Sequence, residues 1–288
     1  MSNRLAIAAA ALRSEGRRGL SPYLTAGDGG LARTLQLLHA LERAGATCCE
    51  LGVPFSDPSA DGPVLQAAAD RALEAGTTVD GILKMVRQFR NEGGQLPIAL
   101  MSYWNPLGHR GWSSICSKSA DAGVDGFIIP DLPVEEGSEV RAAAIVYDLC
   151  TIFFAAPTSS DQRIQAAAEA STGFLYVVGR TGVTGAGTTF DESAQDFLQR
   201  VQRIAGDIPT AVGFGIATSD DVAKATQHAD IAIVGTALVR HIHEVASAAQ
   251  SNSGTAQSSA ATTSAVNAAE KYVRELCTGL TQTSQPQS

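Results

Sequence analysis

The sequence lacks the features that would mark a secreted, membrane or nucleic-acid-binding protein. Its five cysteines form no CxxC pair, and the odd count predicts reduced core thiols in a cytoplasmic protein. No apolar run is long enough to cross a bilayer, and the first residues do not resemble a secretion signal. The net charge of −8 argues against nucleic acid and membrane surfaces as partners. It does not exclude an anionic substrate, because backbone N–H groups bind phosphate locally.

Motifs of several enzyme classes are absent as well. The five histidines have no metal-ligand spacing with cysteine, aspartate or glutamate, so we expect no metal. The local sequence suggests no serine–histidine–aspartate arrangement. No GxGxxG motif opens the first strand–helix unit, which disfavours a doubly wound dinucleotide-binding sheet.

What is present is an alternation of short apolar runs with segments of helical spacing. The expected strands are residues 20–25, 48–52, 97–102, 126–130, 150–155, 174–178, 210–213 and 231–234. Helices are expected at 4–14, 31–44, 63–75, 79–90, 113–122, 135–147, 161–170, 192–204 and 219–226. Strands that are apolar on both faces are typical of parallel sheets covered on both sides. The pattern predicts an α/β fold, a single-domain TIM (β/α)8 barrel with an extra N-terminal helix, and a doubly wound open sheet is the alternative.

The C-terminal part of the chain differs in composition. Residues 1–245 would form the barrel, whereas residues 246–264 are almost entirely Ala, Ser, Thr, Gln, Asn and Gly. We expect this low-complexity segment to be a mobile insert, because it has too little apolar surface to bury. Residues 265–280 regain helical spacing and are predicted to be the last outer helix of the barrel, followed by a disordered tail at 281–288.

Two carboxylates around the second expected strand are the first candidate site residues. Glu50 lies inside an apolar run, where a carboxylate is costly unless it is paired or functional. It is either an acid/base group at the barrel mouth or an acid satisfied by interior hydrogen bonds. Asp61 lies in the following loop, just before Pro63 opens a helix. Taken alone, Asp61 is more simply a turn or helix-entry residue.

Glycine-rich segments after the last three expected strands form the second candidate feature. They comprise residues 183–187, residues 213–215, and Gly235 with Thr236. Such strand ends in barrels often bind phosphate through backbone N–H groups, and ordinary turns and helix caps are the alternative. Tyr176 lies on one face of the sixth strand, where an aromatic usually fills the barrel. The loop at 180–190 has the composition of a mobile lid, or of a connection without catalytic use.

These residues together resemble a known family. The run from Glu50 to Pro63, Glu-Leu-Gly-Val-Pro-Phe-Ser-Asp-Pro-Ser-Ala-Asp-Gly-Pro, strongly resembles the signature of the tryptophan synthase alpha chain. Residues 22–28, 130–136, 180–185, 213–216 and 235–236 match the family in the same order. The resemblance implies a lyase that cleaves indole-3-glycerol phosphate to indole and glyceraldehyde 3-phosphate. It also implies an alpha2-beta2 tetramer with a beta chain that receives the indole, and pyridoxal phosphate only in that partner.

The resemblance further implies a role for each candidate residue. Glu50 would carry the acid/base work of a retro-aldol reaction, and Asp61 would accept a hydrogen bond from the indole N–H. Thr184 would orient Asp61, and Tyr176 would line the site near Glu50. The implied phosphate-binding residues are Gly185, Phe214, Gly215, Gly235 and Thr236, and the implied indole pocket comprises Tyr23, Met101, Phe154 and Ile233.

Three other interpretations stay open on the sequence. The chain could be a stand-alone lyase that releases free indole, a barrel isomerase of a phosphorylated sugar, or a non-catalytic partner-binding barrel. The intact Glu50 and Asp61 argue against the last of these. Residues 27–30 and 102–105 depart from the family pattern on loops that could face a partner, and residues 246–264 have no counterpart in it.

Overall fold

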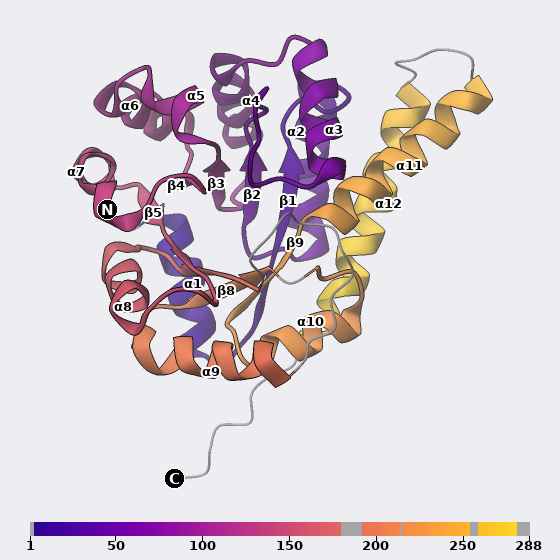
Figure 1. Ribbon diagram of the computed structural model, residues 1–288. Coiled ribbons are helices and arrows are strands. Elements are labelled where there is room, and N and C mark those ends of the chain that lie inside the picture. The colour runs from indigo at the N-terminus through magenta and orange to yellow at the C-terminus, as the bar shows by residue number, and fades with distance from the viewer. Residues whose placement is uncertain (1–2, 180–191, 214, 254–258, 281–288) are drawn as a thin grey trace.

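Short runs rich in Val, Ile, Leu and Ala form the parallel strands of a barrel in the computed structural model, which describes residues 3–179, 192–213, 215–253 and 259–280 (Figure 1). The strands are β1 Gly19–Thr25, β2 Cys49–Gly52, β3 Ile98–Met101, β4 Gly126–Ile128, β5 Cys150–Ile152, β6 Phe154–Ala155, β7 Leu175–Val178, β8 Thr210–Gly213 and β9 Ile231–Val234. They pair in the order β5-β4-β3-β2-β1-β9-β8-β7-β6. The two end strands, β5 and β6, are separated only by Phe153, so one interrupted strand joins the two edges of the sheet. The predicted TIM barrel is confirmed, and its fifth expected strand is split.

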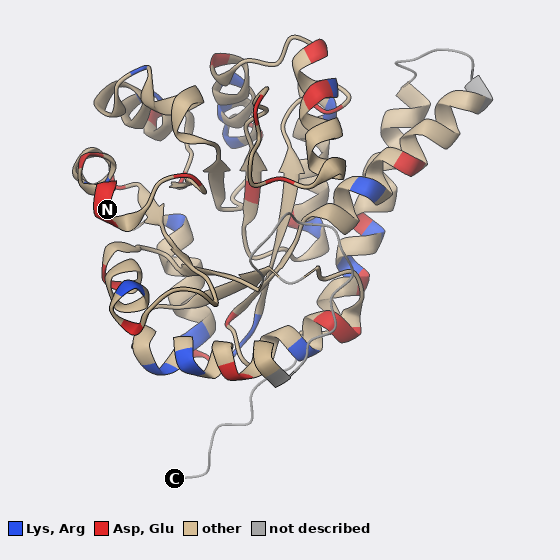
Figure 2. Cartoon of the chain, viewed as in Figure 1, with Lys and Arg blue, Asp and Glu red and all other residues tan. Residues whose placement is uncertain are grey.

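Helices surround the barrel because most of them bury one apolar face against the strands. They are α1 Arg4–Ser14, α2 Leu31–Ala44, α3 Pro63–Glu74, α4 Val79–Asn91, α5 Trp104–Gly108, α6 Trp112–Ala122, α7 Ser138–Val146, α8 Asp161–Ala170, α9 Glu192–Ala205, α10 Ser219–Thr226, α11 Thr236–Ser253 and α12 Ser259–Cys277, with a 3-10 turn η1 at Val134–Glu136. Charged residues lie mainly on these helices and on loops (Figure 2). Within the described ranges, no helix could cross a membrane. Across the same ranges, His, Cys, Asp and Glu side chains form no metal-binding cluster.

The extra N-terminal helix packs on the interior of the barrel. Leu5, Ala9 and Leu12 of α1 belong to the same buried cluster as Cys48 and Phe174. These last two residues directly precede β2 and β7, so α1 covers the ends at which the strands begin. The opposite end, at which the strands finish, is left for a site.

Two short elements of the structure depart from the sequence expectation. The turn α5 follows β3 because Asp131, from the next loop, accepts a hydrogen bond from the backbone N–H of Trp104 at 2.8 Å. The helix expected at 135–147 is divided at Gly137 into η1 and α7. A Cβ at Gly137 would lie 2.5 Å from the ring of Phe153, so the chain approaches the barrel closely there.

The expectation of an insert without ordered structure at 246–264 requires correction. Residues 246–253 complete α11 and residues 259–264 begin α12, and the two helices lie side by side and project from the barrel (Figure 1). Alanine has the highest helix propensity, and Ala246, Ala261 and Ala265 are buried in the helix packing. The low complexity therefore reflects small residues at a close helix–helix contact. α12 then packs back on the barrel, where it also contacts α2.

Candidate active site

The ends of β1, β2, β7 and β9 bring most of the predicted site residues to one mouth of the barrel. Glu50 of β2 lies directly beside Tyr23 of β1 in the strand register. Phe154 of β6 lies beside Tyr176 of β7, and their rings are 4.7 Å apart. Residues from distant parts of the chain therefore meet around one carboxyl group.

Glu50 is the chemically most unusual residue of this mouth. Its side chain is only 1% exposed. Burial raises the pKa of Glu50 to about 8, although the hydroxyls of Ser21 and Tyr176 favour the carboxylate and act in the opposite direction. The Ser21 hydroxyl donates to Oε1 of Glu50 at 3.4 Å. A carboxyl group that titrates near neutral pH can both give and take a proton.

Tyr23 forms part of the wall beside Glu50. A Cβ at Gly52 would lie 2.0 Å from the Tyr23 hydroxyl oxygen, so only glycine at the end of β2 leaves room for that ring. Burial raises the pKa of Tyr23 well above its usual value, and the nearby Asp61 and Glu50 charges add to the effect. Tyr23 therefore stays neutral and presents an aromatic face with a polar tip.

Asp61 is held by a residue that the sequence interpretation did not assign. The hydroxyl of Tyr103, two residues after the end of β3, donates to Oδ2 of Asp61 at 3.1 Å and accepts from the Ala60 N–H at 2.8 Å. The N-cap of α3 is Gly62, so Asp61 does not cap that helix with its side chain. The Asp61 carboxylate therefore makes a tertiary hydrogen bond in addition to lying in the loop before α3. Burial raises the pKa of Asp61, and the Tyr103 hydrogen bond lowers it.

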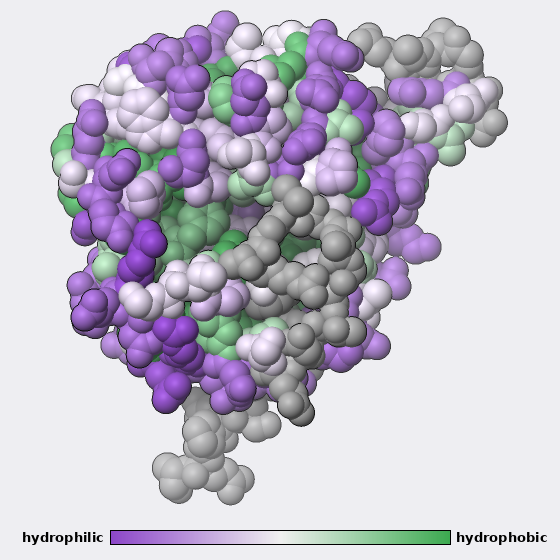
Figure 3. All heavy atoms as spheres, viewed as in Figure 1, coloured by the Kyte–Doolittle hydropathy of each residue, from purple (hydrophilic) through white to green (hydrophobic). Residues whose placement is uncertain are grey.

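The four residues of the predicted indole pocket contribute to adjoining apolar clusters. Ile233 lies with Tyr176 in the interior cluster, and Phe154 packs against it. Tyr23 belongs to a second cluster with Leu65, and Met101 contacts both clusters. Figure 3 shows hydrophobic surface recessed near the middle of this face, inside a rim of hydrophilic side chains. Such a lining suits a flat aromatic ring.

The predicted phosphate-binding residues are only partly placed by the structure. Gly235 directly follows the last strand, β9, and Thr236 begins α11, so backbone N–H groups of a helix start lie at the mouth. Gly215 follows β8 in the left-handed region, with φ of +67°, where glycine is favoured. Thr184, Gly185 and Phe214 lie outside the described residues, as does the whole loop at 180–190.

A polar network fixes the loop after β1 to α3. Arg71 of α3 makes a bidentate contact with Asp28, at 2.9 Å to Oδ1 and 2.8 Å to Oδ2. The buried Arg33 donates to the Asp28 carbonyl oxygen at 2.9 Å. A Cβ at Gly29 would overlap the Arg33 guanidinium, so the Gly-rich loop makes room for that group. This network was not predicted from the sequence.

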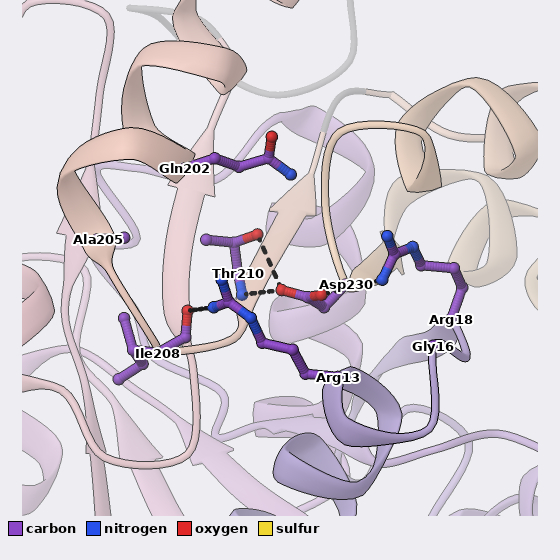
Figure 4. A pocket seen from close by; sticks show the side chains of 8 residues that line it. All are labelled: Arg13, Gly16, Arg18, Gln202, Ala205, Ile208, Thr210 and Asp230. Atoms are coloured by element: carbon purple, nitrogen blue, oxygen red, sulfur yellow. Dashed lines mark hydrogen bonds and ion pairs between the residues drawn. The ribbon is translucent and has the colours of Figure 1, made fainter. Parts of the chain in front are cut away.

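A separate polar cavity lies at the opposite end of the barrel. Its volume is about 180 Å³, and its walls include Arg13, Arg18, Thr210 and Asp230 (Figure 4). Arg18 pairs with Asp230 at 3.0 Å, and the Thr210 N–H donates to Asp230 at 2.9 Å. Thr210 begins β8 and Asp230 directly precedes β9, so the cavity lies where strands start. We therefore place the candidate site at the other end, around Glu50, where the predicted residues converge.

Comparisons with known proteins show the family to which the chain is related. The sequence model of the tryptophan synthase alpha chain family matches residues 9–274. The alpha chain of Alkalilimnicola ehrlichii is 46% identical over 242 residues, which cover 83% of this chain and 87% of that protein. The alpha chain of Chloroflexus aggregans is 44% identical over 254 residues, covering 88% and 95%.

Solved structures show the same similarity in three dimensions. A structure of Mycobacterium tuberculosis tryptophan synthase aligns with a TM-score of 0.83 at 32% identity, over 97% of this chain and 99% of that one. Tryptophan synthase subunit alpha from Legionella pneumophila aligns with a TM-score of 0.81 at 31% identity, over 97% and 98%. The chain therefore belongs to the tryptophan synthase alpha chain family and is a lyase that cleaves indole-3-glycerol phosphate.

Proposed function

We propose that Glu50 moves the protons of this cleavage and that Asp61 holds the indole nitrogen. The substrate is split into indole and glyceraldehyde 3-phosphate by a retro-aldol reaction. Breaking the carbon–carbon bond requires protonation of C3 of the indole and deprotonation of the glycerol hydroxyl. The observation that carries the proposal is the 1% exposed Glu50 carboxyl, with its pKa raised by burial to about 8. Such a group exists in both protonation states near neutral pH.

Asp61 would accept a hydrogen bond from the indole N–H as positive charge develops on the ring. Its Oδ2 is held by Tyr103, which leaves the remaining acceptor capacity of the carboxylate for substrate. Electrostatic stabilisation aimed at developing charge is commonly worth about 3 to 4 kcal/mol. In this proposal Thr184 orients Asp61, and Tyr176 lines the site beside Glu50.

The substrate would lie across the mouth with its two ends in different surroundings. The indole would pack among Tyr23, Met101, Phe154 and Ile233, which combine apolar surface with few polar groups. The phosphate would bind the backbone N–H groups of the opposite rim, formed by Gly185, Phe214, Gly215, Gly235 and Thr236. The chemistry uses only protons and hydrogen bonds, so this chain would need no cofactor of its own.

The chain would act with a tryptophan synthase beta chain in an alpha2-beta2 tetramer. The indole would pass to that partner, which alone would hold pyridoxal phosphate. Trp104, next to Tyr103 at the site end of the barrel, is 39% exposed, and a large exposed aromatic there suits a docking face. The same proposal places the protein in the cytoplasm. It divides the chain into the barrel at residues 1–245, the low-complexity segment at 246–264, the outer helix at 265–280 and a tail at 281–288.

The decisive test replaces each of the two carboxylates and compares the variant with a matched control variant. Glu50→Gln should abolish indole formation while the substrate still binds, and Glu74→Gln, an exposed change at the end of α3, should have no effect. Asp61→Asn should lower kcat, whereas Asp57→Asn in the same loop should not. Retained turnover in Glu50→Gln would refute the acid/base assignment. Indole production measured with and without a beta chain distinguishes the subunit from a stand-alone lyase.

A further inference from the structure

Ser21 places a hydroxyl group in the otherwise apolar interior of the barrel. It belongs to β1, is fully buried, and lies two residues before Tyr23, so both side chains point to the same face of the strand. In the register of the sheet it lies beside Ile233, and the interior cluster there also contains Ala211 and Ile231. A buried hydroxyl is unfavourable unless it has a hydrogen-bond partner.

The partner of Ser21 is the carboxyl group of Glu50. The Ser21 Oγ lies 3.4 Å from Oε1 of Glu50, and it also interacts with the Cys48 thiol. A hydroxyl is both a donor and an acceptor. It can therefore donate to a carboxylate and accept from a carboxylic acid without moving. Tyr176 offers the same chemistry to Glu50 from β7.

We propose that Ser21 is a positioning residue for Glu50, whose hydroxyl keeps the carboxyl group oriented in both of its protonation states. The inference rests on the proposed acid/base role of Glu50. A carboxyl group that changes charge inside an apolar barrel would otherwise be left with an unsatisfied atom in one state, and that atom would favour rotation toward another partner. With Ser21 in place, the same carboxyl oxygen of Glu50 stays available to the substrate in each proton transfer.

The other titratable groups around Glu50 change charge at a different pH from Glu50 itself. In the described part of the chain these are Tyr23 of β1, Tyr176 of β7, and Cys48 and Cys49 on the side of β2. Burial raises the pKa of each of them, to about 12 for Cys48, so all four are neutral near pH 8. Asp61 acts on both tyrosines and is the remaining nearby charge.

The test compares two substitutions that differ only in the hydroxyl group. Ser21→Thr and Ser21→Val add the same volume, so a difference between them reports the hydrogen bond and not the packing. We expect Ser21→Val to lower kcat about threefold to tenfold relative to Ser21→Thr, with KM changed less than about twofold. The limb of the pH–rate profile that belongs to Glu50 should move to higher pH by about half to one unit, because the carboxylate loses a donor. Ser119→Ala removes another fully buried serine hydroxyl, in α6, and should change neither quantity.

A second measurement separates this inference from the proposed function. Infrared or carbon-13 spectra of the purified chain, compared with those of Glu50→Gln, report the titration of the Glu50 carboxyl directly. A higher titration midpoint in Ser21→Val than in Ser21→Thr, together with the kcat difference, supports the positioning role. Equal midpoints and equal kcat values in the pair, with Glu50→Gln inactive, would overturn the role of Ser21 and leave the proposed function intact. An active Glu50→Gln variant would instead remove the proposed function and this inference together.

Discussion

Replacement of Tyr103 by phenylalanine tests how the loop carboxylate is held. The change removes the hydroxyl that donates to Oδ2 of Asp61 at 3.1 Å and accepts from the Ala60 N–H at 2.8 Å, while the ring remains 5.5 Å from Phe55. A hydrogen bond to a charged group contributes about 1.5 to 3 kcal/mol. Asp61 is only partly buried, so water can replace part of that interaction and we expect about 1 to 2 kcal/mol.

This free energy converts to a fall in kcat/KM of about 5-fold to 30-fold for Tyr103→Phe. The pKa of Asp61 should also rise further, because the hydrogen bond that lowers it is gone, so activity should be lost at a higher pH on the acid side. The assay is indole formation from indole-3-glycerol phosphate as a function of pH. Tyr272→Phe is the matched control, because it also removes a partly buried tyrosine hydroxyl that donates a hydrogen bond, here to the Ala217 carbonyl oxygen. An unchanged kcat/KM in Tyr103→Phe would refute the view that Tyr103 orients Asp61.

Three further predictions concern charge and space around the site. Burial raises the Glu50 pKa from 4.5 to about 8, so between these pH values the folded state binds a proton that the unfolded state has released. The free energy of unfolding of the wild type, measured in urea, should therefore fall by a few kcal/mol relative to that of Glu50→Gln as pH rises from about 4.5 to 8. Asp28→Asn should lower the free energy of unfolding by about 3 kcal/mol, because Arg33 and Arg71 lose a buried charge partner. Glu270→Gln, whose partners Arg43 and Arg274 are both exposed, should cost about 0.5 kcal/mol. Gly52→Ala should displace the Tyr23 ring and lower kcat/KM more than tenfold, and a crystal structure with that ring unmoved would contradict the argument.

The sequence by itself determined the barrel and its most unusual residue. Most strands and helices follow from local periodicity, and their expected ranges agree with the structure to within a few residues. Glu50 could be singled out because the cost of a carboxylate in an apolar run is visible in its immediate neighbours. The signature from Glu50 to Pro63 is likewise a local feature, so the family could be named before any coordinate was known.

Only the tertiary structure decided which groups act on those residues. Tyr103 lies 42 residues from Asp61, Arg71 lies 43 from Asp28, and Ser21 lies 29 from Glu50, so no local pattern joins them. The helical parts of residues 246–264 were missed for a similar reason, because their alanines are buried by a partner helix and composition alone indicated a mobile insert. Local sequence fixes periodicity, whereas hydrogen-bond partners and burial depend on which strands become neighbours when the sheet closes. For the same reason the local sequence around Asp61 indicates a turn residue, whereas in the folded chain its carboxylate is held by the Tyr103 hydroxyl.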